Sequence, residues 1–196
     1  MSVICIGDSL TEGDYGIKGK SGIANVHSEN YPHFLSLLTG EETRNFGKCG
    51  WRSARMLDWY KTGAVPVQDA SHIIVLLGTN GGQTPEGTSP DDLAYKELIF
   101  RLLKDAPEAK LWLCTPPHVT VNPVMSNCGY RRQVDNATAF IRAFAREQGL
   151  RMIDLAADPR FCDDTESLYQ PNDGLHFSKE GYRVLAKAIA EGMGLI

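Results

Sequence analysis

Short, nearly continuous apolar runs alternate with longer amphipathic segments along almost the whole chain. Five of these runs predict strands: Val3–Ile6, Thr43–Phe46, Ile73–Leu77, Leu111–Cys114 and Met152–Leu155. Such runs are typical of strands that are covered on both faces. Strands that alternate with helices indicate a parallel sheet, and right-handed crossovers restrict its topology. We therefore expect an α/β fold, a three-layer α/β/α sandwich with a flavodoxin-like parallel five-stranded sheet in the order 2-1-3-4-5.

The segments between the runs predict four helices: Tyr31–Leu38, Asp91–Lys104, Val134–Gln148 and Lys179–Glu191. End signals support three of them. Ser89 is a candidate cap followed by Pro90, Ser178 is a second candidate cap, and Gly149 is a stop signal. In the first helix, we expect the core face to consist of Phe34, Leu35, Leu37 and Leu38.

Composition narrows the class of protein. We expect one domain over residues 1–196, because this length suits a single core. A formal net charge of -4 argues against a nucleic-acid partner. No apolar run is long enough for membrane insertion, and we see no signal peptide, which favours a cytoplasmic location. The five scattered cysteines lack CxxC spacing, so we expect reduced thiols, with neither a disulfide framework nor a zinc site.

Three long connections follow predicted strands: Glu12–Asn30, Thr79–Ser89 and Thr115–Arg132. Long loops in a compact domain tend to be functional. Open α/β sheets place their sites at the carboxyl ends of their strands, which is where these loops begin. We therefore look for chemistry at that edge of the sheet.

Ser9 follows the first predicted strand within the stretch IGDSLTEG, residues 6–13. One reading is that Asp8 or Ser9 simply caps a following turn. The other is that Ser9 is a nucleophile, which requires an oriented base because a hydroxyl alone is a poor nucleophile. The octapeptide leaves both readings open.

Among the five histidines, His176 is distinguished by its neighbour Asp173. Residues three apart on one turn can face each other, so the carboxylate can hold one ring nitrogen and leave the other for Ser9. A plain turn is the alternative reading, since residues 171–174 are turn formers. The remaining histidines have ordinary explanations on a helix surface, before a strand or in loops: His33, His72, His27 and His118.

An ester hydrolase also needs preorganised donors for the negative charge that develops on the carbonyl oxygen. Two stretches at predicted strand ends can supply them. Gly50 ends the stretch NFGKCG and offers a backbone N–H, while Asn80 in the stretch GTNGG offers a side-chain amide. Ordinary glycine-rich turns are the alternative for both stretches.

Taken together, four blocks resemble the SGNH (GDSL) hydrolase superfamily. They are GDSLTEG at 7–13, NFGKCG at 45–50, GTN at 78–80 and DGLH at 173–176. All four occur in this order over nearly the whole chain, at the predicted strand ends, which makes the combination specific although most blocks are weak alone. The resemblance implies the SGNH hydrolase fold and a GDSL-type esterase that needs neither a metal nor an organic cofactor.

The resemblance also implies a role for each matching residue. Ser9 corresponds to the nucleophile, His176 to the general base and acid, and Asp173 to the residue that orients the histidine. The oxyanion donors correspond to the backbone of Ser9, the backbone of Gly50 and the side chain of Asn80. The third block usually continues with an aspartate that helps to hold its loop, and residue 81 here is glycine.

The substrate is less constrained. Tyr15 and Tyr130 lie in the long loops, Trp51 directly follows Gly50, and all three are candidate substrate contacts. Arg131 and Arg132 can bind an anionic group or form a solvated face. We expect a small-molecule ester with a short acyl group such as acetyl, and a carbohydrate is one candidate for the alcohol part. Alternatives are a thioesterase or lysophospholipase with the same site, and a non-catalytic flavodoxin-like ligand-binding module.

Overall fold

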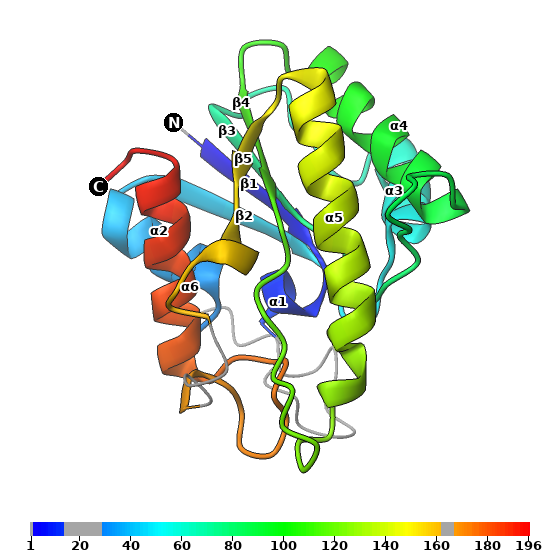
Figure 1. Cartoon of the computed structure of the whole chain (residues 1–196). Helices are drawn as coiled ribbons and strands as arrows, with labels where there is room; N and C mark the ends of the chain where they lie inside the picture. The colour runs from blue at the N-terminus through cyan, green and yellow to red at the C-terminus, as the bar shows by residue number, and fades with distance from the viewer. Residues whose placement is uncertain (1, 14–28, 162–166) are drawn as a thin grey trace.

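The computed structural model describes residues 2–13, 29–161 and 167–196. Its strands form one parallel sheet in the order β2-β1-β3-β4-β5, which confirms the predicted topology. The strands are β1 (Ser2–Gly7), β2 (Glu42–Gly47), β3 (His72–Leu76), β4 (Lys110–Cys114) and β5 (Arg151–Ile153). Helices cover both faces of the sheet, so the three-layer α/β/α arrangement is also confirmed (Figure 1).

The α-helices differ in length and in the face that they cover. They are α1 (Ser9–Glu12), α2 (Tyr31–Thr39), α3 (Ser53–Lys61), α4 (Pro90–Asp105), α5 (Arg131–Gln148) and α6 (Lys179–Gly192), with short 3-10 turns η1 (Cys128–Tyr130) and η2 (Leu155–Ala157). Helices α2 and α6 pack on one face of the sheet, and α3, α4 and α5 pack on the other (Figure 1).

Strand β1 contributes to both cores, because successive residues of a strand point to opposite faces. Val3 and Cys5 belong to the core under α2 and α6, whereas Ile4 and Ile6 belong to the core under the other three helices. All four side chains are fully buried. Burying an aliphatic side chain of this size contributes about 1.5–3 kcal/mol relative to leaving it exposed, so the turn that carries Ser9 follows a firmly anchored strand.

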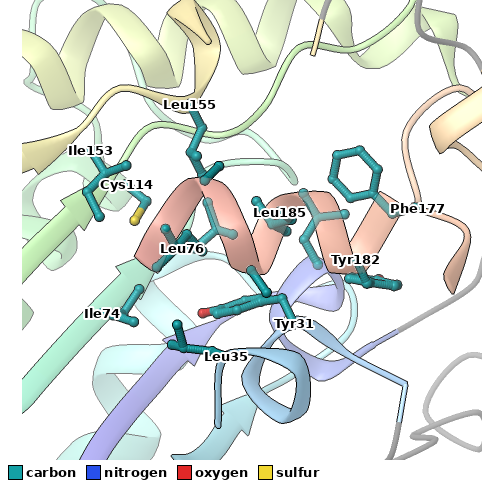
Figure 2. Close-up of a cluster of buried hydrophobic side chains, with 14 of the residues drawn as sticks. Tyr31, Leu35, Ile74, Leu76, Cys114, Ile153, Leu155, Phe177, Tyr182 and Leu185 are labelled. Atoms are coloured by element: carbon teal, nitrogen blue, oxygen red, sulfur yellow. The ribbon is translucent and has the colours of Figure 1, made fainter. Parts of the chain in front are cut away.

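Aromatic and aliphatic side chains from distant parts of the chain meet in the first of these cores. Figure 2 shows Tyr31 and Leu35 of α2 beside Tyr182 and Leu185 of α6, with Phe177 close to the start of α6. All five side chains are buried. This packing fixes the C-terminal segment that precedes α6 against the N-terminal half of the sheet.

The three predicted signals for helix ends, at Ser89, Gly149 and Ser178, are confirmed. Ser89 and Asp92 form a capping box at the start of α4, in which each side chain accepts a hydrogen bond from the other residue's backbone N–H. The Ser178 side chain caps α6, and Gly149 ends α5 in the left-handed conformation.

The prediction for the core face of α2 was half wrong. Phe34 and Leu35 are buried as predicted, but Leu37 is 68% exposed and Leu38 is 43% exposed. Leu37 lies two residues after Leu35 and is therefore turned by about 200° around the helix, away from the core. Leu38 lies in the last full turn, where it is only half covered.

The predicted pattern also missed α3 entirely. Its buried apolar residues are Met56, Leu57 and Tyr60, and the charged residues of the helix alternate with them in sequence: Arg55, Asp58 and Lys61. The spacing i, i+1, i+4 is the helical one. Gly63, in the left-handed conformation just after the helix, was a further available signal.

Two further boundaries differ from the prediction. Leu155 lies in η2 instead of the last strand, because the chain turns at Asp154, whose carboxylate binds the Thr115 hydroxyl and the Arg142 guanidinium. Helix α5 begins at Arg131, before Val134. Its first three residues are polar, so apolar periodicity does not mark them.

Four of the five cysteines lie among the described residues. Cys5 and Cys114 are buried, and Cys49 and Cys128 are partly exposed. Burial raises the pKa of Cys5 to about 12, so its thiol stays protonated. Cys162 lies outside the described residues. Across the described ranges, every helix lacks the length or the apolar character needed to cross a membrane.

The first three strands end at one edge of the sheet. Gly7 lies opposite Gly47 of β2 and opposite Leu76 of β3 in the parallel register. The chain therefore leaves all three strands at the same level, and the turns that carry Ser9, Gly50 and Asn80 start there. In Figure 1 this edge faces the lower part of the molecule, next to α1.

Candidate active site

Ser9 is the first residue of α1, directly after the turn at the end of β1. The Asp8 carboxylate caps this helix by accepting a hydrogen bond from the Leu10 N–H at 3.1 Å. The turn is tight: a Cβ added at Gly7 would lie 2.0 Å from the Thr11 Oγ1. The capping reading was therefore correct for Asp8, and it leaves the Ser9 hydroxyl free for a different contact.

That contact is with His176. The Ser9 Oγ lies 3.1 Å from the His176 Nε2, and the His176 Nδ1 lies 3.1 Å from the Asp173 Oδ2. The Asp173 Oδ1 also accepts hydrogen bonds from the backbone N–H groups of Leu175 and His176, at 2.9 and 2.6 Å. The structure thus joins the three residues in the order serine, histidine, aspartate.

The charge state of Asp173 follows from these contacts. Burial raises the pKa of its carboxyl, but the hydrogen bonds and charge of His176, with the Leu175 N–H, outweigh burial and hold the pKa below its usual value. Asp173 is therefore ionised at neutral pH. An ionised carboxylate at the Nδ1 edge fixes the ring so that its Nε2 faces the serine.

The loop that carries Asp173 is held by the long connection after β4. Backbone N–H groups of Thr120, Ser126 and Asn127 donate to the carbonyls of residues 174, 172 and 173, at 3.1, 2.8 and 3.0 Å. Gly174 is in the left-handed conformation (φ 77°), and a Cβ there would lie 2.1 Å from the Thr120 Cγ2. We call residues 120–127 the bracing segment, because its backbone binds three consecutive residues of the Asp173 loop.

A second set of hydrogen bonds ties α1 to the turn after β2. The Glu12 carboxylate accepts from the Cys49 N–H at 2.6 Å, and the Asn45 amide donates to the Thr11 carbonyl at 2.9 Å. The next residue after Cys49 is Gly50, in the left-handed conformation (φ 72°). A Cβ at Gly50 would meet nothing within 4 Å, so glycine is needed there for backbone conformation instead of close approach.

Asn80 lies in a turn between Gly78 and Gly81 and is tied to the same network. Its side-chain Nδ2 donates to the Trp51 carbonyl at 3.0 Å, which places it beside the Gly50 turn. An amide nitrogen carries two N–H donors, so this bond uses one of them. The preceding N–H, that of Thr79, donates to the Asp8 Oδ2 at 3.2 Å.

Asp8 therefore links the start of α1 to the turn after β3. It is fully buried, and burial raises the pKa of its carboxyl to about 6, although hydrogen bonds from Leu10 and Thr79 and the charge of His176 oppose this rise. The sequence pattern predicted Asp8 only as a cap and predicted no role for Glu12. Their positions inside the GDSLTEG block were the available signal.

For the three candidate substrate residues, the structure shows fewer contacts that bear on function than it shows for Ser9, His176 and Asp173. The Trp51 ring packs edge-on against Trp59 with centroids 5.5 Å apart, and the Arg55 guanidinium lies 4.5 Å from its centroid. Tyr130 ends η1 and is 38% exposed. Tyr15 lies outside the described residues. The substrate roles of these three residues remain predictions.

Arg131 and the other histidines have structural contacts. Arg131 pairs with Asp135 and also contacts the His118 Nε2 at 2.7 Å, whereas Arg132 is exposed. His72 is buried in β3 and accepts the Trp112 N–H. His33 is partly buried on α2, where its ring meets Phe34 edge-on, and His27 lies outside the described residues.

In the described part of the chain, no group of three or more His, Cys, Asp or Glu side chains has an arrangement that could hold a metal ion.

A comparison with protein-family models matches residues 5–184 to the GDSL-like Lipase/Acylhydrolase family. The chain belongs to this family. Membership agrees with the family resemblance of the four sequence blocks, and it makes the protein a carboxylic ester hydrolase of the GDSL/SGNH type. A search of curated protein sequences found no match.

Solved structures of similar fold include several esterases. An aryl esterase of M. smegmatis has a TM-score of 0.75 at 18% identity, with 100% of this chain and 99% of that chain covered. Est24, a carbohydrate acetylesterase from Sinorhizobium meliloti, has a TM-score of 0.72 at 18% identity, with 98% of each chain covered. A lipase/acylhydrolase from Enterococcus faecalis has a TM-score of 0.71 at 18% identity, with 98% and 94% covered. At these identities the likeness supports the fold of this family member and leaves its substrate open.

Proposed function

We propose that this protein is a serine esterase that hydrolyses short-chain acyl esters, acetyl esters above all, through an acyl-enzyme on Ser9. The observation that carries the proposal is the chain of 3.1 Å contacts from the Ser9 hydroxyl through His176 to Asp173. Residues that lie far apart in sequence converge there in the geometry that nucleophilic catalysis requires.

In the first half-reaction, the Ser9 Oγ attacks the ester carbonyl while its proton passes to the His176 Nε2. Collapse of the tetrahedral intermediate breaks the bond to the alcohol, and the same proton moves from His176 to the departing oxygen. Asp173 stays ionised throughout and stabilises the imidazolium that forms in between. The products of this step are the free alcohol and an acyl group on Ser9.

In the second half-reaction, water replaces the alcohol. His176 takes a proton from the water, the resulting nucleophile attacks the acyl-enzyme, and the proton returns to the Ser9 Oγ as the acid leaves. Three proposed donors stabilise the negative charge of both tetrahedral intermediates by hydrogen bonds: the backbone N–H groups of Ser9 and Gly50 and the second N–H of the Asn80 amide. The first N–H groups of a helix have no intrahelical partner, which suits the N–H of Ser9.

The acyl preference and the carbohydrate alcohol are the finer part of the proposal. The names of two neighbours of similar fold, an aryl esterase and a carbohydrate acetylesterase, are compatible with small esters. Acetylated sugars, p-nitrophenyl esters of graded chain length, acyl-CoA and lysophospholipid compared by kcat/KM test this part. The highest kcat/KM on acetyl esters supports the proposal; the highest value on acyl-CoA or lysophospholipid contradicts it.

Replacement of the nucleophile tests the mechanism. Ser9→Ala removes the attacking oxygen, so we expect hydrolysis of p-nitrophenyl acetate to fall to near the uncatalysed rate while the thermal midpoint stays close to that of the wild type. Ser36→Ala is the matched control, because it removes a helical hydroxyl that only donates to the His33 carbonyl. It should keep full activity.

A fluorophosphonate probe gives an independent readout. The probe should label wild-type protein at Ser9, as seen by mass spectrometry of peptides, and should leave Ser9→Ala unlabelled. A Ser9→Ala variant that keeps most of its turnover, or a wild type that resists the probe, would refute the acyl-enzyme.

A further inference from the structure

The turn that carries Asn80 is held by side chains from two other elements. The Thr79 carbonyl accepts the Gln133 Nε2 of α5 at 2.9 Å, and the Asn80 carbonyl accepts the Arg52 Nε at 2.9 Å. Within the turn, the Gly81 N–H donates to the Gly78 carbonyl. The orientation of the Asn80 amide therefore depends on contacts made outside the turn itself.

Of the two side chains, Gln133 has the more protected contact. Thr79 is only 1% exposed, and a buried backbone carbonyl that loses its donor carries a desolvation penalty. Arg52 binds on the exposed side of the turn, where water can replace its N–H. Loss of the Gln133 donor should therefore shift the turn, whereas loss of the Arg52 donor should be tolerated.

Packing also holds Gln133 in place. Gly81 has a φ of 72°, and a Cβ built on it would lie 2.9 Å from the Gln133 Oε1, 3.0 Å from its Cβ and 3.1 Å from its Cδ. The glutamine side chain thus lies flat against the Gly81 backbone. It occupies the space that a side chain at position 81 would need, so its stem and its donor are both constrained.

We propose that Gln133 is a positioning residue that sets the Asn80 amide for transition-state stabilisation. Two hydrogen bonds at successive residues define the position of this amide: Gln133 to the Thr79 carbonyl, and the Asn80 side chain to the Trp51 carbonyl. The inference rests on the proposed function, in which the remaining Asn80 N–H faces the developing oxyanion. Gln133 acts through Asn80 and touches no reacting atom.

The first test removes the donor and keeps the shape. Gln133→Met retains the length of the side chain, and Gln133→Glu retains its outline but replaces the N–H with an oxygen. Because misplaced oxyanion donors lose much of their effect, both variants should lower kcat for p-nitrophenyl acetate about tenfold or more. KM should stay within about twofold, because the oxyanion forms only after substrate binds. Gln148→Met, the same change at the exposed end of the same helix, should leave both constants unchanged.

A double-mutant cycle then separates positioning from a general effect on the fold. If Gln133 acts only through Asn80, adding Gln133→Met to the Asn80→Ala variant should not lower kcat any further. Equal losses in both backgrounds, a change in KM alone, or unchanged kcat in both Gln133 variants would overturn the proposal. So would an Asn80→Ala variant with full kcat, since no donor would then need positioning. Failure of the proposed function itself is distinguishable, because it shows as an active Ser9→Ala variant.

Discussion

Asp8 and Ser9 make different contacts at the start of α1: Asp8 caps the helix, and Ser9 contacts His176. The Asp8 carboxylate satisfies the Leu10 N–H, so the Ser9 hydroxyl need not cap the helix and instead faces His176. The other Asp8 oxygen binds the Thr79 N–H, one residue before Asn80. The residue next to the proposed nucleophile therefore fixes the turn that carries the proposed oxyanion donor.

At the same scale, Asn80 itself can be tested. Asn80→Ala removes a donor that the proposal aims at the oxyanion, so we expect a loss of about 3 kcal/mol of transition-state stabilisation, seen mainly in kcat. The change also removes the hydrogen bond to the Trp51 carbonyl, so thermal melting should accompany the kinetics. Unchanged kcat in a folded variant would mean that the amide serves only to hold the Trp51 turn.

Between elements, the important relation is that of the bracing segment, residues 120–127, to the Asp173 loop. Neither stretch belongs to a helix or a strand, and each orders the other through the three backbone hydrogen bonds at residues 172, 173 and 174. Among the described residues, Asn172 is the one residue other than glycine whose backbone is left-handed, with a φ of 63°. Its carbonyl accepts one of these three hydrogen bonds. The conformation of the Asp173 loop is thus held both by its own hydrogen bonds and by those from the bracing segment.

A paired glycine substitution tests this relation. Gly174→Ala adds a methyl group that would lie 2.1 Å from the Thr120 Cγ2, so it should displace the bracing segment and lower kcat/KM sharply. Gly40→Ala is the control, because Gly40 has a similar φ of 71° and open space around its Cβ. It should cost about 1 kcal/mol of unfolding free energy for backbone strain and leave activity intact. Equal effects of the two changes on activity would contradict the bracing role.

For the molecule as a whole, the period of the apolar pattern predicted the sheet, its order and its layers correctly. The continuous runs of β1 and β3 carried this information, because both faces of those strands are buried. Helix α3 was missed since its apolar positions, Met56, Leu57 and Tyr60, are few. Leu37 was misplaced on the buried face, although its position two residues after the buried Leu35 turns it to the opposite side of the helix.

The candidate site could be predicted only in part, for a related reason. Ser9, Asp173 and His176 lie in recognisable local blocks, so sequence marked them, and the structure brings them together. Gln133 and Glu12 contact backbone groups of distant turns. A side chain that binds a backbone carbonyl or N–H leaves no matching residue type in the partner segment, so no local pattern points to it.

The buried carboxyl of Asp8 should give the stability of the whole fold a pH dependence. Because its pKa is about 6 in the folded protein and about 3.9 unfolded, the folded state holds the proton more tightly. This contribution is fully present below the unfolded value and is lost as pH rises through the folded value. Relative to Asp8→Asn, the wild type should lose up to about 3 kcal/mol of unfolding free energy between about pH 4 and pH 7. Denaturant titrations of both proteins measure it, and a difference that does not vary with pH would contradict the assignment.

The contact between Ser9 and His176 joins residues 167 positions apart in the chain. During synthesis or refolding, His176 reaches the Ser9 turn only when the segment before α6 docks against the N-terminal half of the sheet. Contacts between residues this far apart in sequence are slow to form in folding, because closing the long loop between them costs conformational entropy first. Under the proposed mechanism, a partly folded chain therefore holds a serine turn with no means of activating it. Hydrolysis would then begin only once the two ends of the sequence have met.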